Sequence, residues 1–142
     1  GIWKPASDDF FKKFAAPWRP GWPLGDEKGQ QWENIVAGEY LDARHNFAVS
    51  LANQVQSGFA DLSLSREALA HLEYMKPVYP SAHPAFWKNY GLVLHQLMQL
   101  DPSLKPKVID AWSLYLRNKT APDPQEPAIR GIISGLEKEL GR

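Results

Sequence analysis

The stretch HPAFWKNYGLVLHQL, residues 83–97, carries the strongest fold signal in the chain, because a later stretch repeats its plan. Residues 126–140 read EPAIRGIISGLEKEL, and both stretches open with an ionisable residue, then Pro-Ala, then an apolar residue. Proline is tolerated in the first turn of a helix, so each Pro-Ala predicts a helix start. Apolar residues then recur at i, i+4, i+7 and i+11, as on one helix face. The same helix pattern therefore occurs twice, about 43 residues apart.

Sliding the chain against itself by 43 residues brings further positions into register. The pairs are Asn46 with Asn89, Leu51 with Leu94, Ala68 with Ala111, Lys76 with Lys119, and Pro84 with Pro127. They fall at helix starts, small residues and apolar stripes. A period of about 20–50 residues is typical of repeat proteins, whose units bury their apolar faces against one another. We therefore predict stacked helical hairpins, with units at about 41–83 and 84–126 and a terminal helix at 127–142.

Three short motifs give this repeat a family resemblance. They are Trp87-x-x-Tyr90-Gly91-x-x-Leu94, Ala68-x-x-x-Leu72 followed by Pro80, and Ala111-x-x-x-Tyr115. The first resembles the first helix of a tetratricopeptide repeat (TPR), and the other two resemble its second helix. The small residues Gly91, Ala48, Ala68 and Ala111 would allow paired helix backbones to approach closely. The resemblance covers about residues 40–142, although the family's unit has about 34 residues and this one is longer.

The fold class expected is all-α, since no segment alternates apolar and polar residues over strand length. Helix signals dominate from about residue 31, with Gly38 as a candidate break and Ser63 or Ser65 as a helix cap. Residues 1–30 form an irregular arm rich in Pro and Trp, with one short helix expected after Ser7. The resemblance implies that the helical hairpins stack antiparallel into a short right-handed solenoid.

Composition excludes several classes of function. The 142 residues carry 16 basic and 16 acidic side chains, so the chain lacks the basic surplus of a general nucleic-acid binder. No apolar run approaches the roughly 20 residues of a membrane span. Cysteine is absent, which leaves cytoplasm and periplasm equally open. The start at Gly1 rather than Met is compatible with a removed signal peptide or anchor of a membrane-attached bacterial protein.

No reactive constellation is recognisable in the sequence. The four histidines lie in no HExxH or paired arrangement that would hold a metal, and no nucleotide-binding or nucleophile motif occurs. The carboxylates are scattered over loops and helix faces. We therefore expect neither an enzyme nor a cofactor or metal site.

The resemblance instead implies a protein-interaction scaffold that binds a peptide or helix in its concave groove, which the first helices of the units line. The groove residues it indicates are Asp42, His45, Asn46, Val49, Asn53, Lys88, Asn89, Leu92, His95 and Gln96. In the terminal helix the corresponding places are Gly131, Gly135 and Lys138. Asn46 and Asn89 match an asparagine ladder known in O-GlcNAc transferases of the family, and Ile132 takes its third place.

Two other readings stay open. The tryptophan arm, through Trp18 and Trp22, could bind a carbohydrate or a cell-envelope component, although packing onto the helical body is favoured. Alternatively, two units and one extra helix leave an apolar end that a second copy could cover, which would make a homo-oligomer. The aromatic residues Trp87 and Trp112 are expected in the core.

Overall fold

The computed structural model describes residues 31–57, 61–81 and 83–142. The arm at residues 1–30, with its expected short helix and with Trp18 and Trp22, lies outside the described residues. Within them the regular secondary structure consists of helices, with no strand, which confirms the predicted all-α class. The elements are α2 (Gln31–Gln56), α3 (Ser63–Met75), η1 (Tyr79–Ser81), α4 (Ala85–Leu97), η2 (Pro102–Leu104), α5 (Lys105–Asn118) and α6 (Glu126–Glu139).

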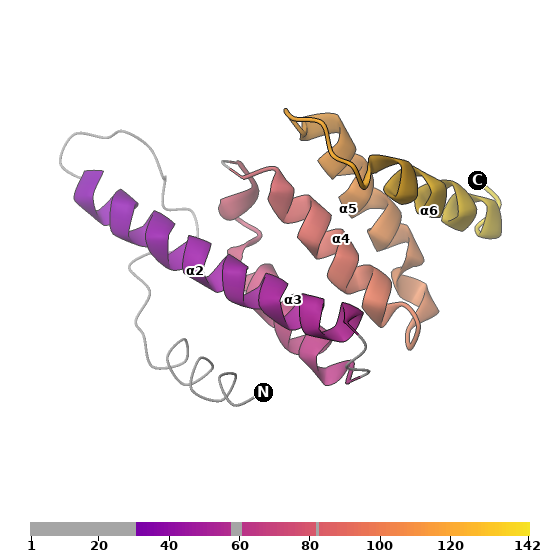
Figure 1. Cartoon of the computed structure of the whole chain (residues 1–142), viewed down its shortest axis with the longest axis horizontal. Coiled ribbons are helices and arrows are strands. Elements are labelled where there is room, and N and C mark those ends of the chain that lie inside the picture. The colour runs from indigo at the N-terminus through magenta and orange to yellow at the C-terminus, as the bar shows by residue number, and fades with distance from the viewer. Residues whose placement is uncertain (1–30, 58–60, 82) are drawn as a thin grey trace.

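The helices follow one another across the molecule in chain order (Figure 1). Helix α2 packs on α3, α3 on α4, α4 on α5, and α5 on α6. Helix α2 also contacts α4, which is two helices further along the chain. Each helix therefore contacts its sequence neighbour, and α2 and α4 also meet directly.

Aspartates in the connecting turns set where several helices begin. Oδ1 of Asp61 accepts a hydrogen bond from the Ser63 amide at 3.0 Å, before α3. Oδ1 of Asp101 accepts from the Ser103 amide at 3.1 Å, at the start of η2, which leads into α5. These bonds satisfy amides that a helix start leaves without a partner. The predicted serine cap is wrong, because α3 has no side-chain cap bond and Ser65 is fully buried inside the helix.

Helix α2 is one continuous helix of 26 residues, so the predicted break at Gly38 is also wrong. Glycine lowers helix stability by only about 1 kcal/mol, which the packing of neighbouring turns offsets here. Ala37 and Leu41 on either side of Gly38 are fully buried. Tertiary contacts therefore keep the helix continuous through Gly38.

The small residues of the repeat lie where helices pack. Ala48 and Ala68 are fully buried, and Ala111 is 2% exposed. A Cβ placed on Gly91 would lie 2.3 Å from Cδ1 of Trp112, closer than real Cβ contacts occur. The Trp112 indole N–H donates to the Lys88 carbonyl at 3.0 Å, which holds the ring in place over α4. Gly91 thus permits the close packing of α4 on α5.

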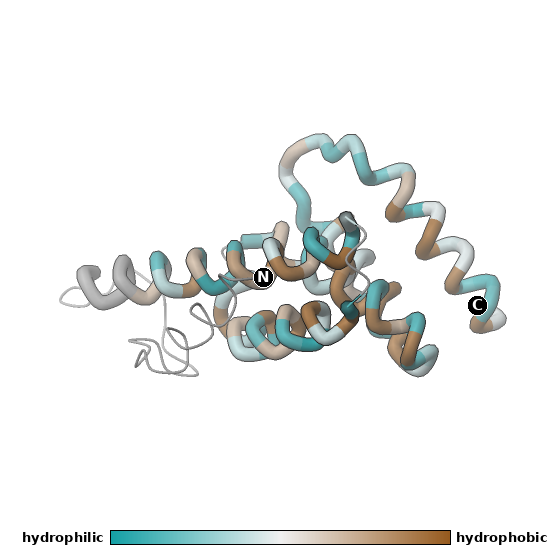
Figure 2. The backbone as a smooth tube through the Cα atoms, turned by 60° about the horizontal axis from the view of Figure 1, so that its bottom comes forward, coloured by the Kyte–Doolittle hydropathy of each residue, from teal (hydrophilic) through white to brown (hydrophobic). Residues whose placement is uncertain are grey.

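One apolar core extends from α2 to α6. Its largest fully buried side chains are Phe86, Leu41, Leu51, Leu72, Met75, Leu94, Val93 and Val108. Figure 2 shows α6 at an outer edge of the molecule, with apolar residues recurring along its length. Only Ile129 and Leu136 of α6 are buried. No helix in the described part of the chain combines the length and apolar character needed to cross a membrane.

Candidate functional site

Helices α2, α4 and α6 together line a cavity of about 530 Å³, which we call the groove. Its lining is Val49, Asn53 and Gln56 of α2, Lys88, Asn89, Leu92 and His95 of α4, Trp112 of α5, and Gln125, Ala128, Ile129 and Ile132 at α6. The volume is within the range of about 300–1,000 Å³ that is usual for ligand sites. Residues from four helices and from the turn before α6 therefore line one cavity.

Trp112 and His95 lie side by side in the groove lining. Trp112 is 4% exposed, so most of its ring packs in the core, as expected from the sequence. The His95 ring lies 5.3 Å from the Trp112 ring, centroid to centroid. Burial lowers the pKa of His95, so its imidazole is neutral at pH 7. This part of the groove is aromatic and uncharged.

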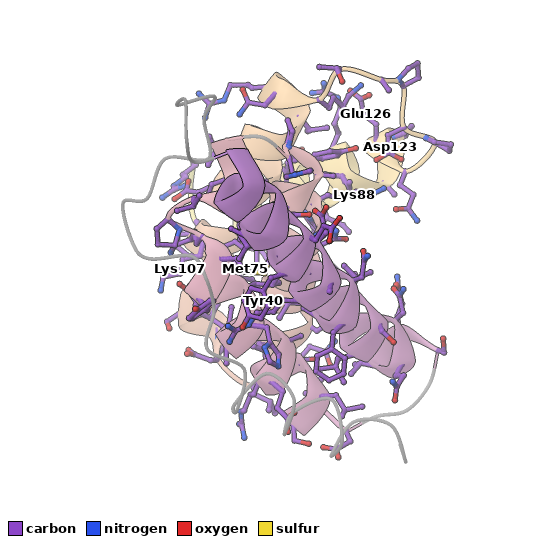
Figure 3. The ribbon with its side chains drawn as sticks, turned by 90° about the vertical axis from the view of Figure 1, so that its left-hand side faces the viewer. Tyr40, Met75, Lys88, Lys107, Asp123 and Glu126 are labelled. Carbon is purple, nitrogen blue, oxygen red and sulfur yellow. The ribbon has the colours of Figure 1, made fainter. Side chains whose placement is uncertain are left out.

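An ion pair fastens α4 to the turn that starts α6. Lys88 Nζ lies 2.7 Å from Oδ2 of Asp123, and Figure 3 shows the two residues together with Glu126 close by. The Tyr115 hydroxyl donates to the same carboxylate oxygen at 2.6 Å, and the Gln125 amide donates to Oδ1 at 2.9 Å. The lysine and these two donors hold the pKa of Asp123 well below its usual range. Burial, together with the carboxylate, raises the pKa of Tyr115 to about 12.

A polar cluster around His45 connects α2 to α4. His45 is 8% exposed, and its Nε2 lies 3.1 Å from Nδ2 of Asn89. Because a carboxamide nitrogen only donates, His45 accepts this bond and carries its proton on Nδ1. Nδ1 faces the Tyr79 hydroxyl at 3.5 Å, and that hydroxyl donates to Oδ1 of Asp42 at 2.6 Å. Two helices and η1 are thereby joined through one buried imidazole.

The charge state of this cluster follows from its burial. Desolvation, and after it the nearby His83, lowers the pKa of His45. His83 Nε2 lies 3.7 Å from Oδ1 of Asp42, and its ring stacks on Tyr79 at 4.3 Å. Burial and the Asp42 carboxylate raise the pKa of Tyr79 far above its usual value. His45 and Tyr79 are therefore both neutral at pH 7.

The predicted groove residues thus fall into separate environments. Val49, Asn53, Lys88, Asn89, Leu92 and His95 line the groove. Asn46 is exposed and lies with Val49 and Asn53 in an adjoining cavity of about 370 Å³ on α2. Asp42 and His45 belong to the polar cluster and line neither cavity.

The sequence predicts Gln96 in the groove, but the residue lies in the core. It is 6% exposed, and its Oε1 accepts from the Ser65 hydroxyl at 2.8 Å. Its Nε2 donates to the carbonyl of Ala52 at 2.9 Å. The side chain therefore joins α2, α3 and α4 and offers nothing to a partner.

Of the α6 residues that the sequence assigned to the groove, Ile132 lines it, whereas Gly131, Gly135 and Lys138 do not. Gly131 and Gly135 are exposed and have nothing within 4 Å of an added Cβ, whereas Ala128 and Ile132 line the groove. The 43-residue register did contain a signal, since it aligns Ile132 with Asn89. It held no signal for Gln56 or Gln125, whose positions depend on helix length and on the turn before α6.

Comparison with known proteins adds no identity: no family model, no curated protein and no solved structure matches this chain. Among the described residues, no group of three or more His, Asp or Glu side chains is placed to hold a metal ion. The groove geometry is therefore the basis for any functional conclusion.

Proposed function

We propose that the chain is a non-catalytic, TPR-like interaction scaffold that binds a segment of a partner protein in the groove. The observation that carries the proposal is that α2, α4 and α6, together with Trp112 of α5, line a single cavity. In a stack of helical hairpins, one helix of each pair faces the inner surface. The order of packing from α2 to α6 and the contact between α2 and α4 agree with such a stack.

The composition of the groove supports binding rather than catalysis. General acid–base chemistry needs a titratable group whose pKa is tuned close to the working pH and which can reach the substrate. Of the described titratable residues in the lining, Lys88 is paired with Asp123, and His95 is packed on Trp112. The remaining lining consists of carboxamides and aliphatic side chains. Such groups recognise shape and backbone, and they transfer no proton.

A groove-filling substitution tests this proposal. Ala128 is exposed and lies in the lining, so Ala128→Trp would occupy the cavity without disturbing the core. Ala70 is an exposed alanine of α3 outside the groove, and Ala70→Trp is the matched control. Peptides selected on the wild-type protein from a random display library should lose binding to Ala128→Trp and keep binding to Ala70→Trp. Equal binding to both variants would exclude the groove as the recognition surface.

A further inference from the structure

A second cavity, of about 310 Å³, lies between α5 and α6, and we call it the outer cavity. Helix α6 is the last helix in the row and packs on α5 (Figure 1). The outer cavity is lined by residues that the groove does not use, namely Ser113, Leu116 and Arg117 of α5 and Arg130, Ile133, Ser134 and Glu137 of α6. The four α6 residues recur at i, i+3, i+4 and i+7, the spacing of one helix face. Helix α6 therefore has one face at the groove and another at the outer cavity.

Two ion pairs show that α5 and α6 run antiparallel beside this cavity. Lys119, just after α5, lies with Nζ 2.9 Å from Oε2 of Glu126 at the start of α6. Lys105, at the start of α5, lies with Nζ 2.8 Å from Oε2 of Glu139 at the end of α6. The last turn of α5 is therefore beside the first turn of α6.

This orientation separates the charges of the outer cavity. Arg117, near the end of α5, and Arg130, near the start of α6, lie toward the same end. Glu137, two turns further along α6, lies toward the other end. The half-buried aliphatic side chains of Leu116 and Ile133 line the cavity as well. The outer cavity thus has a positive end, a negative end and apolar lining residues.

These charges are available to a partner. Within the described residues, neither Arg117 nor Glu137 forms a side-chain ion pair. The side chain of Arg130 is 62% exposed and pairs with Glu126 at 2.7 Å. An exposed ion pair of this kind contributes little stability, and Glu126 keeps Lys119 if Arg130 finds another carboxylate.

A second copy of the chain supplies the complementary pattern. In a two-fold symmetric contact, the same patch occurs on both subunits, so residue i meets j and j meets i. Arg130 and Glu137 are about 10 Å apart along the helix axis, at about 1.5 Å per residue. When two such helices lie antiparallel, Arg130 of each copy is opposite Glu137 of the other. Ile133 of each copy is then opposite the small, exposed Ser134 of the other.

We infer that the chain forms a homodimer in which the α5–α6 outer cavities of two copies face each other, with Arg130 of each copy paired with Glu137 of the other. This inference goes beyond the proposed function, because the groove uses another face of α6, at Ala128, Ile129 and Ile132. Both copies keep their grooves open in this arrangement.

Sedimentation velocity of the full chain at low salt, from micromolar to millimolar concentration, tests the dimer. The wild type should change from monomer to dimer as the concentration rises. Glu137→Arg should raise the dissociation constant by about tenfold or more, because two-fold symmetry places the change at two contacts. Glu39→Arg is the matched control and should leave it unchanged, since Glu39 is an exposed glutamate of α2 outside the outer cavity. A wild type that stays monomeric throughout, or equal dimerisation of both variants, would overturn the inference.

A mixing experiment tests the antiparallel register. Arg130→Glu and Glu137→Arg each place like charges opposite each other and should dimerise poorly alone. Their equimolar mixture restores both opposite-charge pairs and should associate with about the wild-type dissociation constant. Circular dichroism checks that each variant is folded; should one not fold, Glu137→Gln, which keeps the side-chain size, should weaken the dimer by about two- to tenfold. A mixture of folded variants that associates no better than either alone, or a Glu137→Gln dimer as tight as the wild type, would refute the pairing of Arg130 with Glu137.

Discussion

Replacing Gly91 by alanine should destabilise the fold, although alanine is the better helix former. The added Cβ would lie 2.3 Å from Cδ1 and 2.4 Å from Nε1 of Trp112. That ring is 4% exposed and bonded to the Lys88 carbonyl at 3.0 Å, so it has little room to move. Overpacking costs about 1–3 kcal/mol and a lost hydrogen bond about 1 kcal/mol, against a gain of about 1 kcal/mol in helix propensity. The net expectation is a loss of about 1–3 kcal/mol.

Urea unfolding followed by circular dichroism measures this change through the midpoint at constant slope. Gly131→Ala is a direct control, because Gly131 is an exposed helical glycine with nothing within 4 Å of an added Cβ. It should stabilise by about 0.5–1 kcal/mol. In a Trp112→Leu background, Gly91→Ala should no longer destabilise. If Gly91→Ala stabilises the wild type as much as Gly131→Ala does, the close packing of α4 on α5 is wrong.

Three further predictions concern the polar contacts. Ser65→Ala should lower the free energy of unfolding, measured in urea, by about 1–3 kcal/mol, because it leaves Oε1 of Gln96 buried without its donor. Adding Gln96→Leu should recover most of this loss. The pKa of His45 is lowered in the folded state, so the unfolded chain binds more protons below about pH 6.5. The free energy of unfolding should therefore decrease as the pH is lowered through that range, and His45→Gln should reduce this dependence on pH. Asp123→Ala should speed hydrogen–deuterium exchange in α6 and leave α2 and α3 unchanged, since it removes the acceptor shared by Lys88 and Tyr115; equal effects on α2 would contradict a local role.

The helices could be predicted from sequence because their signals are local. Pro127 lies in the first turn of α6 and Pro106 in that of α5, as expected for residues that cannot donate a backbone hydrogen bond. The close approach at Gly91 was also foreseeable, since only a small residue permits it. The continuity of α2 through Gly38 was not, because neighbouring packing overrides a weak propensity.

The candidate site was less predictable, because a repeat register assigns a helix position but not its surroundings. Asn53 and Gln96 are equivalent under the 43-residue shift, yet Asn53 is exposed and Gln96 is buried. Helix α4 contacts α2, α3 and α5, whereas α2 comes first among the described helices and contacts α3 and α4. The same register position is therefore buried in α4 and exposed in α2.

The contacts that hold the helices together also shape the groove, and this determines which substitutions can test its function. The bond between His45 and Asn89 joins α2 to α4, and the pair of Lys88 and Asp123 joins α4 to α6. Substituting any of these four residues would change the relative position of two groove walls as well as a surface group. A loss of binding in such a variant would therefore not separate recognition from folding. Substitutions at exposed lining positions, such as Ala128 and Asn53, change what a ligand meets and leave these junctions in place.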